Sequence, residues 1–350
     1  MSLHRLPPEI LLHILRLLGS SFFRQDVRRL LVCRWWCRLA RPVLLQDLDL
    51  TATSLEAMVN ASGRRGMVDS IKNHVKTVSI GFDGFEDWPS AQTGSEHAEI
   101  DFRVVTMWTY HLNVSLDSLG RTLRQCTKLQ SLRLEARPEL HDPQLGLQER
   151  DYLLGRGLVS LLSLSHLTCL EFDTAGTSLV DATTYLHLCH EIHSRLPTLR
   201  RLRCRMRRLC PHLLDPPPVS APTLGLEDLI VNLSLSETSS SDTSYRYPIC
   251  CRLGPVSLRK GFPRLQADME LKARELVRVM KNPRIVRVVS HTFPSLEMRS
   301  FDALTGRRMR LPPAAAWDAD GEEVEEESVQ DQTGIFDSDD SSTTSEESLL

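Results

Sequence analysis

The side chains best suited to metal chemistry gather on one short segment, at His187, Cys189, His190 and His193. Spacing of three residues places the three histidines on one face of a helix, where zinc could use them with a fourth ligand from elsewhere. The alternative is an ordinary helix surface, because Cys189 falls on the apolar side of the same helix. The second interpretation is favoured, so neither a metal nor another cofactor is predicted.

The densest group of basic side chains is a run of arginines: Arg200, Arg201, Arg203, Arg205, Arg207 and Arg208. In an alternating strand, Arg201, Arg203 and Arg205 share one face, and Arg133 and Glu171 of preceding strands are expected nearby. Three interpretations remain open. The arginines form a solvated face balanced by neighbouring acids, they bind an acidic or phosphorylated target, or the acidic C-terminal tail folds back onto them.

Catalytic motifs give no support for an enzyme, since the sequence contains neither a glycine-rich phosphate loop nor a nucleophile elbow. A helix-turn-helix is a further alternative, because several arginines lie between residues 24 and 38. However, Trp35, Trp36 and Leu39 occupy faces that a recognition helix would leave polar. We therefore predict a protein without catalytic activity, and a function other than nucleic-acid binding is favoured.

Composition bounds the architecture. A chain of 350 residues with 41% hydrophobic residues can form two or three domains with a sizeable core. The whole chain carries −3, and residues 318–350 hold 13 acids with no Lys or Arg, which leaves +10 for residues 1–317. The acidic, serine-rich end is expected to be disordered. The nine cysteines lack the spacing of a disulfide framework, which predicts reduced thiols in the cytoplasm or nucleus.

No membrane association is expected. The apolar run from Ile10 to Leu18 is interrupted by His13 and Arg16, which argues against a signal peptide. No stretch reaches the roughly 18 uninterrupted apolar residues of a membrane span.

The sequence predicts two regions that differ in secondary structure. Residues 1–42 predict two helices, the first opened by Pro7-Pro8 and stopped near Gly19, the second running from about Gln25 to Ala40 and ended by Pro42. From there on, a six-residue template with apolar first, fourth and sixth positions recurs and predicts strands. It occurs at residues 45–50, 75–80, 129–134, 167–172, 199–204 and 226–231, and in part at 285–290.

Several predicted strands closely follow an amphipathic helix, as when Leu116, Leu119 and Leu123 precede the strand at 129. Strand starts at 129, 167, 199 and 226 are separated by 38, 32 and 27 residues. Periods of this size indicate an α/β solenoid in which each unit buries its apolar face against its neighbours. The drift in spacing predicts irregular repeats.

The N-terminal segment resembles an F-box on two motifs: Leu6-Pro7-Pro8-Glu9-Ile10-Leu11 with Ile14-Leu15, and Leu31-Val32-Cys33-Arg34-Trp35-Trp36. The stretches 35–44 and 301–309 are similar to F-box proteins of filamentous fungi, and the repeats resemble the leucine-rich class. The resemblance implies a helical module that binds the Skp adaptor of cullin-RING ubiquitin ligases. The expected adaptor-binding residues are Leu6, Pro7, Glu9, Ile10, Ile14, Leu15, Leu31, Val32, Cys33 and Trp36.

The sequence thus predicts an α/β protein: a helical F-box (1–42), an irregular leucine-rich-repeat-like βα solenoid (43–317) and a disordered acidic tail (318–350). The function that the resemblance implies is substrate recognition in an SCF-type ubiquitin ligase. Its partners would be the Skp-family adaptor, through it a cullin, and a protein target that the sequence does not name. The expected target-binding residues are Arg133, Glu171, Arg201, Arg203 and Arg205. The alternatives are an interaction scaffold without ubiquitin transfer and, less favoured, a nucleic-acid binder.

Overall fold

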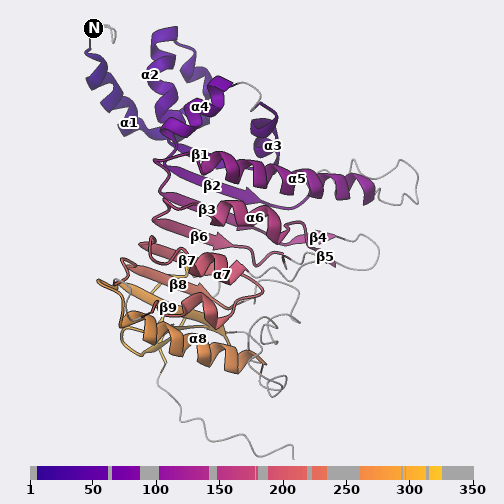
Figure 1. The fold of residues 1–350 in the computed structure, drawn as a ribbon, viewed down its shortest axis with the longest axis vertical. Helices are drawn as coiled ribbons and strands as arrows, with labels where there is room; N and C mark the ends of the chain where they lie inside the picture. Colours follow the sequence, from indigo (N-terminus) through magenta and orange to yellow (C-terminus); the bar gives the residue numbers. More distant parts are fainter. Residues whose placement is uncertain are drawn as a thin grey trace, which may run out of the picture.

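The protein is a mixed α/β molecule, as predicted. The computed structural model describes residues 6–61, 65–86, 102–141, 148–177, 179, 188–218, 223–234, 261–292, 295, 297–312 and 315–324. Three short helices lie at the N-terminal end, and behind them a ten-stranded sheet is stacked along the long axis of the molecule (Figure 1). The N-terminal helices are α1 (Pro8–Gln25), the 3-10 helix η2 (Val27–Leu30) and α2 (Arg34–Leu44).

Seven parallel strands form most of the sheet, and they lie side by side in the order in which they occur in the chain. They are β1 (Asp47–Leu50), β2 (Thr77–Phe82), β3 (Ser131–Ala136), β6 (Cys169–Asp173), β7 (Arg201–Arg205), β8 (Asp228–Asn232) and β9 (Ile285–His291). All seven strands predicted from the apolar template are confirmed. Six of them begin at the third residue of their six-residue window, and β9 begins at the first.

The helices between the strands cover one face of the sheet (Figure 1). They are α3 (Ala52–Ala61), α4 (Arg65–His74), α5 (Phe102–Leu123), α6 (Gly155–Leu162), α7 (Leu188–His193), the 3-10 helix η3 (Pro211–Leu214) and α8 (Gly261–Val277). This placement follows from strand geometry, because alternate side chains point to the same face and the apolar ones require cover.

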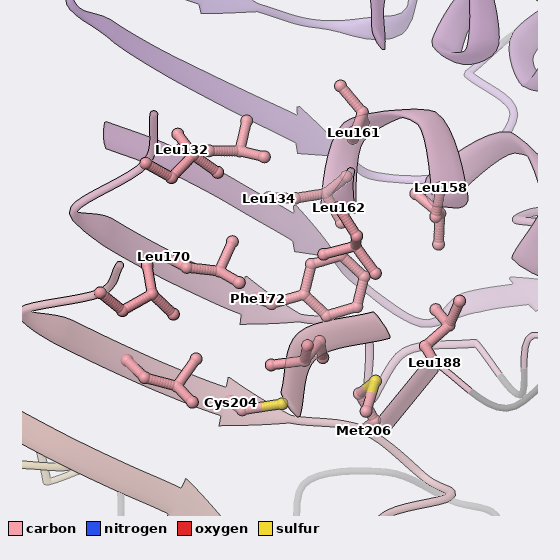
Figure 2. Packing of buried hydrophobic residues seen from close by; sticks show 14 of the residues in the cluster. Leu132, Leu134, Leu158, Leu161, Leu162, Leu170, Phe172, Leu188, Cys204 and Met206 are labelled. Carbon is pink, nitrogen blue, oxygen red and sulfur yellow. The ribbon is translucent and has the colours of Figure 1, made fainter. Parts of the chain in front are cut away.

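Strand register aligns the apolar side chains into ladders. Leu132, Leu170 and Leu202 are neighbours across three strands, and Leu134, Phe172 and Cys204 form the next row. Leu134 and Phe172 point toward Leu162 of α6 (Figure 2). These side chains are completely buried, so the core lies between the sheet and its helices.

The sheet continues beyond β9 with antiparallel strands that the template did not predict. These are β10 (Met298–Asp302), β11 (Arg308–Arg310) and β12 (Glu322–Glu323). A separate hairpin pairs β4 (Glu139–His141) with β5 (Gln148–Arg150). Because β12 belongs to the sheet, the chain stays ordered beyond the predicted boundary at 318. Residues 325–350 of the predicted tail lie outside the described residues.

The predicted second N-terminal helix is wrong in its bounds. The chain forms η2 and then breaks at Leu31–Cys33, where Cys33 Sγ accepts a hydrogen bond from the Trp36 amide at 3.4 Å and caps α2. Pro42 does not end α2, which continues to Leu44 and buries Val43 in the module core. Burial of Val43 offsets the hydrogen bond that proline removes. The predicted stop near Gly19 is a kink, with a positive φ of 75° that suits glycine.

Candidate protein-interaction surfaces

The N-terminal module, defined as residues 6–44, has a small core of its own. Leu11, Leu15 and Phe23 of α1 pack with Leu30 of η2 and with α2. The indole Nε1–H of Trp36 donates to the Arg29 carbonyl at 2.7 Å, which ties α2 to η2. A core of this size supplies only a few kcal/mol, so the module depends on its attachment to the body.

Asp47, at the start of β1, joins the module to the sheet. Its carboxylate accepts a hydrogen bond from Ser20 Oγ at 2.7 Å and another from Thr77 Oγ1 on β2. Its carbonyl accepts a hydrogen bond from the Arg24 guanidinium at 2.7 Å. These contacts hold the end of α1 against the first two strands.

Opposite the core, α1 leaves a stripe of large apolar side chains in solvent. Ile10, Ile14, Leu17 and Leu18 are 50%, 37%, 75% and 41% exposed. Ile10, Ile14 and Leu17 follow one another at helical spacing and therefore lie on one face. Among the described residues, nothing in the body seals this stripe, as would be required if it served only the protein's own core.

The start of η2 and the turn between η2 and α2 expose further apolar side chains. Val27, Leu31 and Val32 are 59%, 75% and 66% exposed. Both α1 and η2 belong to the same packed module. We name the seven residues of the stripe and turn the apolar surface of the module: Ile10, Ile14, Leu17, Leu18, Val27, Leu31 and Val32.

The ten predicted adaptor-binding residues divide into three groups. Exposed are Pro7, Glu9, Ile10, Ile14, Leu31 and Val32, whereas Leu6, Cys33 and Trp36 are partly buried. Leu15 is a correction, because its side chain is 0% exposed and packs between α1 and α2, where no partner can touch it. The prediction missed Leu17, Leu18 and Val27, although the spacing of Leu17 from Ile10 was a signal for it.

Charge around the apolar surface is strongly positive. Residues 6–44 contain seven arginines against two acids, Glu9 and Asp26. Arg16, Arg34, Arg38 and Arg41 are exposed. A partner that covers the apolar surface would therefore gain from acidic residues at its rim.

The second surface is the face of the sheet that the helices leave uncovered, which we call the polar face. Arg201, Arg203 and Arg205 of β7 lie on it, opposite Leu202 and Cys204, as predicted from the alternation. Register places Arg203 beside Glu171, which in turn lies beside Arg133. The five predicted target-binding residues are thus neighbours on three adjacent strands.

Each of these arginines has an acidic partner. Arg133 contacts Glu171 at 3.2 Å, Arg205 contacts Asp173 at 2.8 Å, and Arg201 contacts Asp228 at 3.1 Å. Arg203 pairs with Asp318, which is the first residue of the predicted acidic tail. Two of the open interpretations therefore hold in part, since neighbouring acids balance the run and the start of the acidic segment folds onto it.

The His/Cys segment gives no metal-ligand arrangement in the part of the chain that the structure describes. Cys189 is buried in the core, as expected, and His187 lies outside the described residues. Burial raises the pKa of the Cys126 thiol to about 11, and burial likewise raises the pKa of Cys204. Both thiols are therefore protonated core groups at neutral pH.

Another group of exposed apolar side chains lies on α5 and includes Val104, Met107 and Tyr110. Beside it, Phe85, Trp108 and residues of α3 line a pocket of about 250 Å³. This surface belongs to no motif of the sequence, but it offers a matched control for the module.

Comparison with protein-family models finds none that matches this chain, and a search of curated proteins finds no significant match. None of the described helices is long and apolar enough to cross a bilayer. Function must therefore be argued from the two surfaces themselves.

Proposed function

We propose that this protein is the substrate-recognition subunit of an SCF-type cullin-RING ubiquitin ligase. In this proposal residues 6–44 are an F-box that binds a Skp-family adaptor, and the sheet behind them is an irregular leucine-rich-repeat-like solenoid that binds a target.

One observation carries the proposal: four of the seven residues of the apolar surface belong to the two motifs on which the resemblance depends. Ile10 and Ile14 belong to the first motif, and Leu31 and Val32 belong to the second. Large exposed apolar side chains gathered on a small module are typical of a protein-binding surface. Aliphatic anchors of this kind fill pockets of a partner and contribute most of the binding energy.

The architecture of the body supports the second half of the proposal. Its repeated helix and parallel strand produce an extended sheet whose polar face is open along β1, β2 and β3. Solenoids use such extended faces to bind other proteins. The module and the face are connected rigidly through Asp47, so a target on the face would be held at a fixed position relative to the adaptor.

The proposed mechanism is positioning. A target bound to the body shares one assembly with the ubiquitin-carrying enzyme, which raises the effective concentration of its lysines at the reacting thioester. In this mechanism the chain supplies binding surfaces and the rest of the ligase supplies the chemistry.

Co-purification from cells tests the proposal. The triple variant Leu6→Ala, Pro7→Ala, Ile10→Ala should lose both adaptor and cullin, whereas the wild-type chain retains both. The matched control replaces Val104, Met107 and Tyr110 of α5 by alanine, and should retain both partners. Equal recovery of adaptor with the two variants would overturn the assignment of the surface.

The scaffold alternative makes a different prediction in the same experiment. A scaffold that binds the adaptor without ubiquitin transfer would recover adaptor but no cullin. Reconstituted ubiquitination then decides between the two, because only a ligase subunit increases target ubiquitination in the presence of cullin.

A further inference from the structure

The segment Ala315–Val324, which we call the acidic strap, lies on the polar face at the C-terminal end of the sheet. Asp318 pairs with Arg203 of β7. Asp320 accepts a hydrogen bond from Arg287 of β9 at 2.6 Å, and the Ala319 carbonyl accepts another from the same guanidinium at 2.8 Å. The strap thus binds arginines of two strands with a carboxylate, a backbone carbonyl and a second carboxylate in succession.

An aromatic side chain precedes these acids. The Arg205 guanidinium lies 5.1 Å from the centre of the Trp317 ring, within the range of a cation–π interaction. Trp317 and Ala319 also pack against Ile230 and Val289 of the sheet. The strap therefore has the chemistry of a short bound peptide: one aromatic residue, followed by acids one and three positions later.

In the described structure, Arg203 and Arg287 form their ion pairs with the strap. Glu171, the acidic register neighbour of Arg203, is already paired with Arg133. The side chains of Arg203 and Arg287 are largely buried, at 23% and 10% exposed, so an anion at this place is needed to balance them.

Some polar side-chain atoms of β7 and β8 have no hydrogen-bond partner among the described residues. They are Arg203 Nε, Asp228 Oδ1 and Asn232 Nδ2, and all three are buried. Asp228 and Asn232 are 5% and 0% exposed and belong to β8, which lies between the two arginine-bearing strands. A buried polar atom without a partner is costly, and a ligand that supplied the missing groups would bind better than the strap does.

Release of the strap would uncover Ile230 and Val289, but it leaves the core between the sheet and its helices intact. Asp320 is 89% exposed, Asp318 is 35% exposed, and both residues of β12 are exposed. Leu311, by contrast, is 2% exposed and anchors the chain just before the strap. An ion pair with an exposed carboxylate, such as that of Asp320, and a two-residue strand each stabilise a segment only weakly.

We propose that Arg203, Arg205 and Arg287 form a binding site for an acidic peptide segment of the target, and that the acidic strap occupies this site as an intramolecular competitor. The site deepens the proposed function, on which it rests for the identity of the target as a ligase substrate. A target segment with an aromatic residue followed by two acids displaces the strap.

Gly321 offers a way to unseat the strap without changing any charge. A Cβ atom at this position would lie 2.1 Å from the Arg310 carbonyl oxygen, and backbone cannot rotate away as a side chain can. Gly321→Ala therefore forces the strap from its place. Gly225→Ala is the matched control, because a Cβ there meets nothing within 4 Å.

The test uses the full-length chain and a fluorescein-labelled synthetic peptide with the sequence of residues 315–324, followed by fluorescence anisotropy. Gly321→Ala should bind it roughly tenfold or more tightly than wild type, since the competing closed state is depopulated. Gly225→Ala should bind like wild type. Adding Arg203→Ala to Gly321→Ala should abolish the gain, and a peptide with Asn and Gln in place of the acids should not bind.

Unchanged affinity in Gly321→Ala, or equal binding of the neutral peptide, would overturn the proposal. If Gly321→Ala lowers the melting temperature of the whole chain, Asp318→Asn with Asp320→Asn must give the same gain in affinity, and absence of that gain overturns the proposal as well. Adaptor co-purification by the same variants separates this failure from failure of the proposed function, because the strap lies at the opposite end of the sheet from the module (Figure 1).

Discussion

The N-terminal module and the sheet behind it differ in the burial of their apolar side chains. In the module, Leu31 and Leu17 are each 75% exposed while the core beneath them contains six buried residues. In the sheet, the leucines of the parallel strands are buried by helices, and charged residues occupy the opposite face. The difference teaches that the two parts offer different surfaces: the module exposes apolar side chains, and the sheet exposes charged ones.

The difference in apolar exposure has a physical cause, which is the size of the two parts. Two helices and a 3-10 turn cannot cover every apolar side chain that they carry, whereas each strand of the sheet gains cover from its own helix and from its neighbours. Other segments of the same protein would normally cover the exposed apolar side chains of such a module. Their persistent exposure is the reason to assign them to a partner.

The largest loss of stability is expected from a substitution in the core of the sheet. Phe172→Ala removes a completely buried ring that lies between β6 and α6 and should lower the free energy of unfolding by about 3–5 kcal/mol. Urea denaturation followed by circular dichroism measures it. A loss below about 1 kcal/mol would mean that the strands do not form one continuous core.

The next prediction contrasts two leucines of the same helix. Leu15→Ala should destabilise the module by about 2–5 kcal/mol, because Leu15 is 0% exposed. Leu17→Ala should change stability by less than about 0.5 kcal/mol, because Leu17 is 75% exposed. Hydrogen exchange of the α1 amides reports on both. Equal effects would remove the distinction between core and apolar surface.

A smaller effect is expected on the polar face. Asp173→Asn weakens a largely buried, two-pronged pair with Arg205, and should cost about 1.5–3 kcal/mol. The control is Asp83→Asn, whose pair with Arg137 is more than half exposed on both sides and should contribute at most about 1 kcal/mol. Thermal unfolding in 0.1 M salt compares the two variants, and a larger loss for Asp83→Asn would contradict the account.

The smallest effect concerns His291 of β9, which is buried and stacks on Phe262 with ring centres 4.7 Å apart. Burial lowers the pKa of His291 below its ordinary value of 6.5. The unfolded chain therefore takes up the proton first, and stability is lost as the pH falls below about 6.5 toward the folded-state pKa. His291→Gln should flatten the pH dependence of the melting temperature between pH 7.5 and 5.5. An unchanged slope would contradict this assignment.

The strands of the sheet could be predicted because their pattern has one physical cause. Leu132 and Leu134 alternate with Arg133 since one face is buried and the other is not, and the same alternation recurs at Leu202 and Cys204. Where the pattern is weaker, as at β10 with Met298 and Phe301, no prediction was possible. Pairing with β9 decides that strand, and pairing is a tertiary contact.

The candidate surfaces could be predicted only in part. Ile10 and Ile14, assigned to adaptor binding, are exposed, whereas Leu15 was assigned to the same surface although helical spacing places it beside Leu11 on the core side. The contact of Arg203 with Asp318 spans 115 residues. Local sequence can suggest that opposite charges meet over such a distance, but the pairing depends on how β10 and β11 return the chain to the sheet.

The central claim is that the apolar surface of the module binds a foreign protein, and calorimetric titration of a purified Skp-family adaptor into the full-length chain tests it most directly. The account predicts saturable one-to-one binding with a negative heat-capacity change, as burial of apolar surface requires. It also predicts that Ile10→Asp with Ile14→Asp weakens affinity roughly 30-fold or more while the melting temperature stays the same. Absence of binding by the wild-type chain, or unchanged affinity in the double variant, would contradict it.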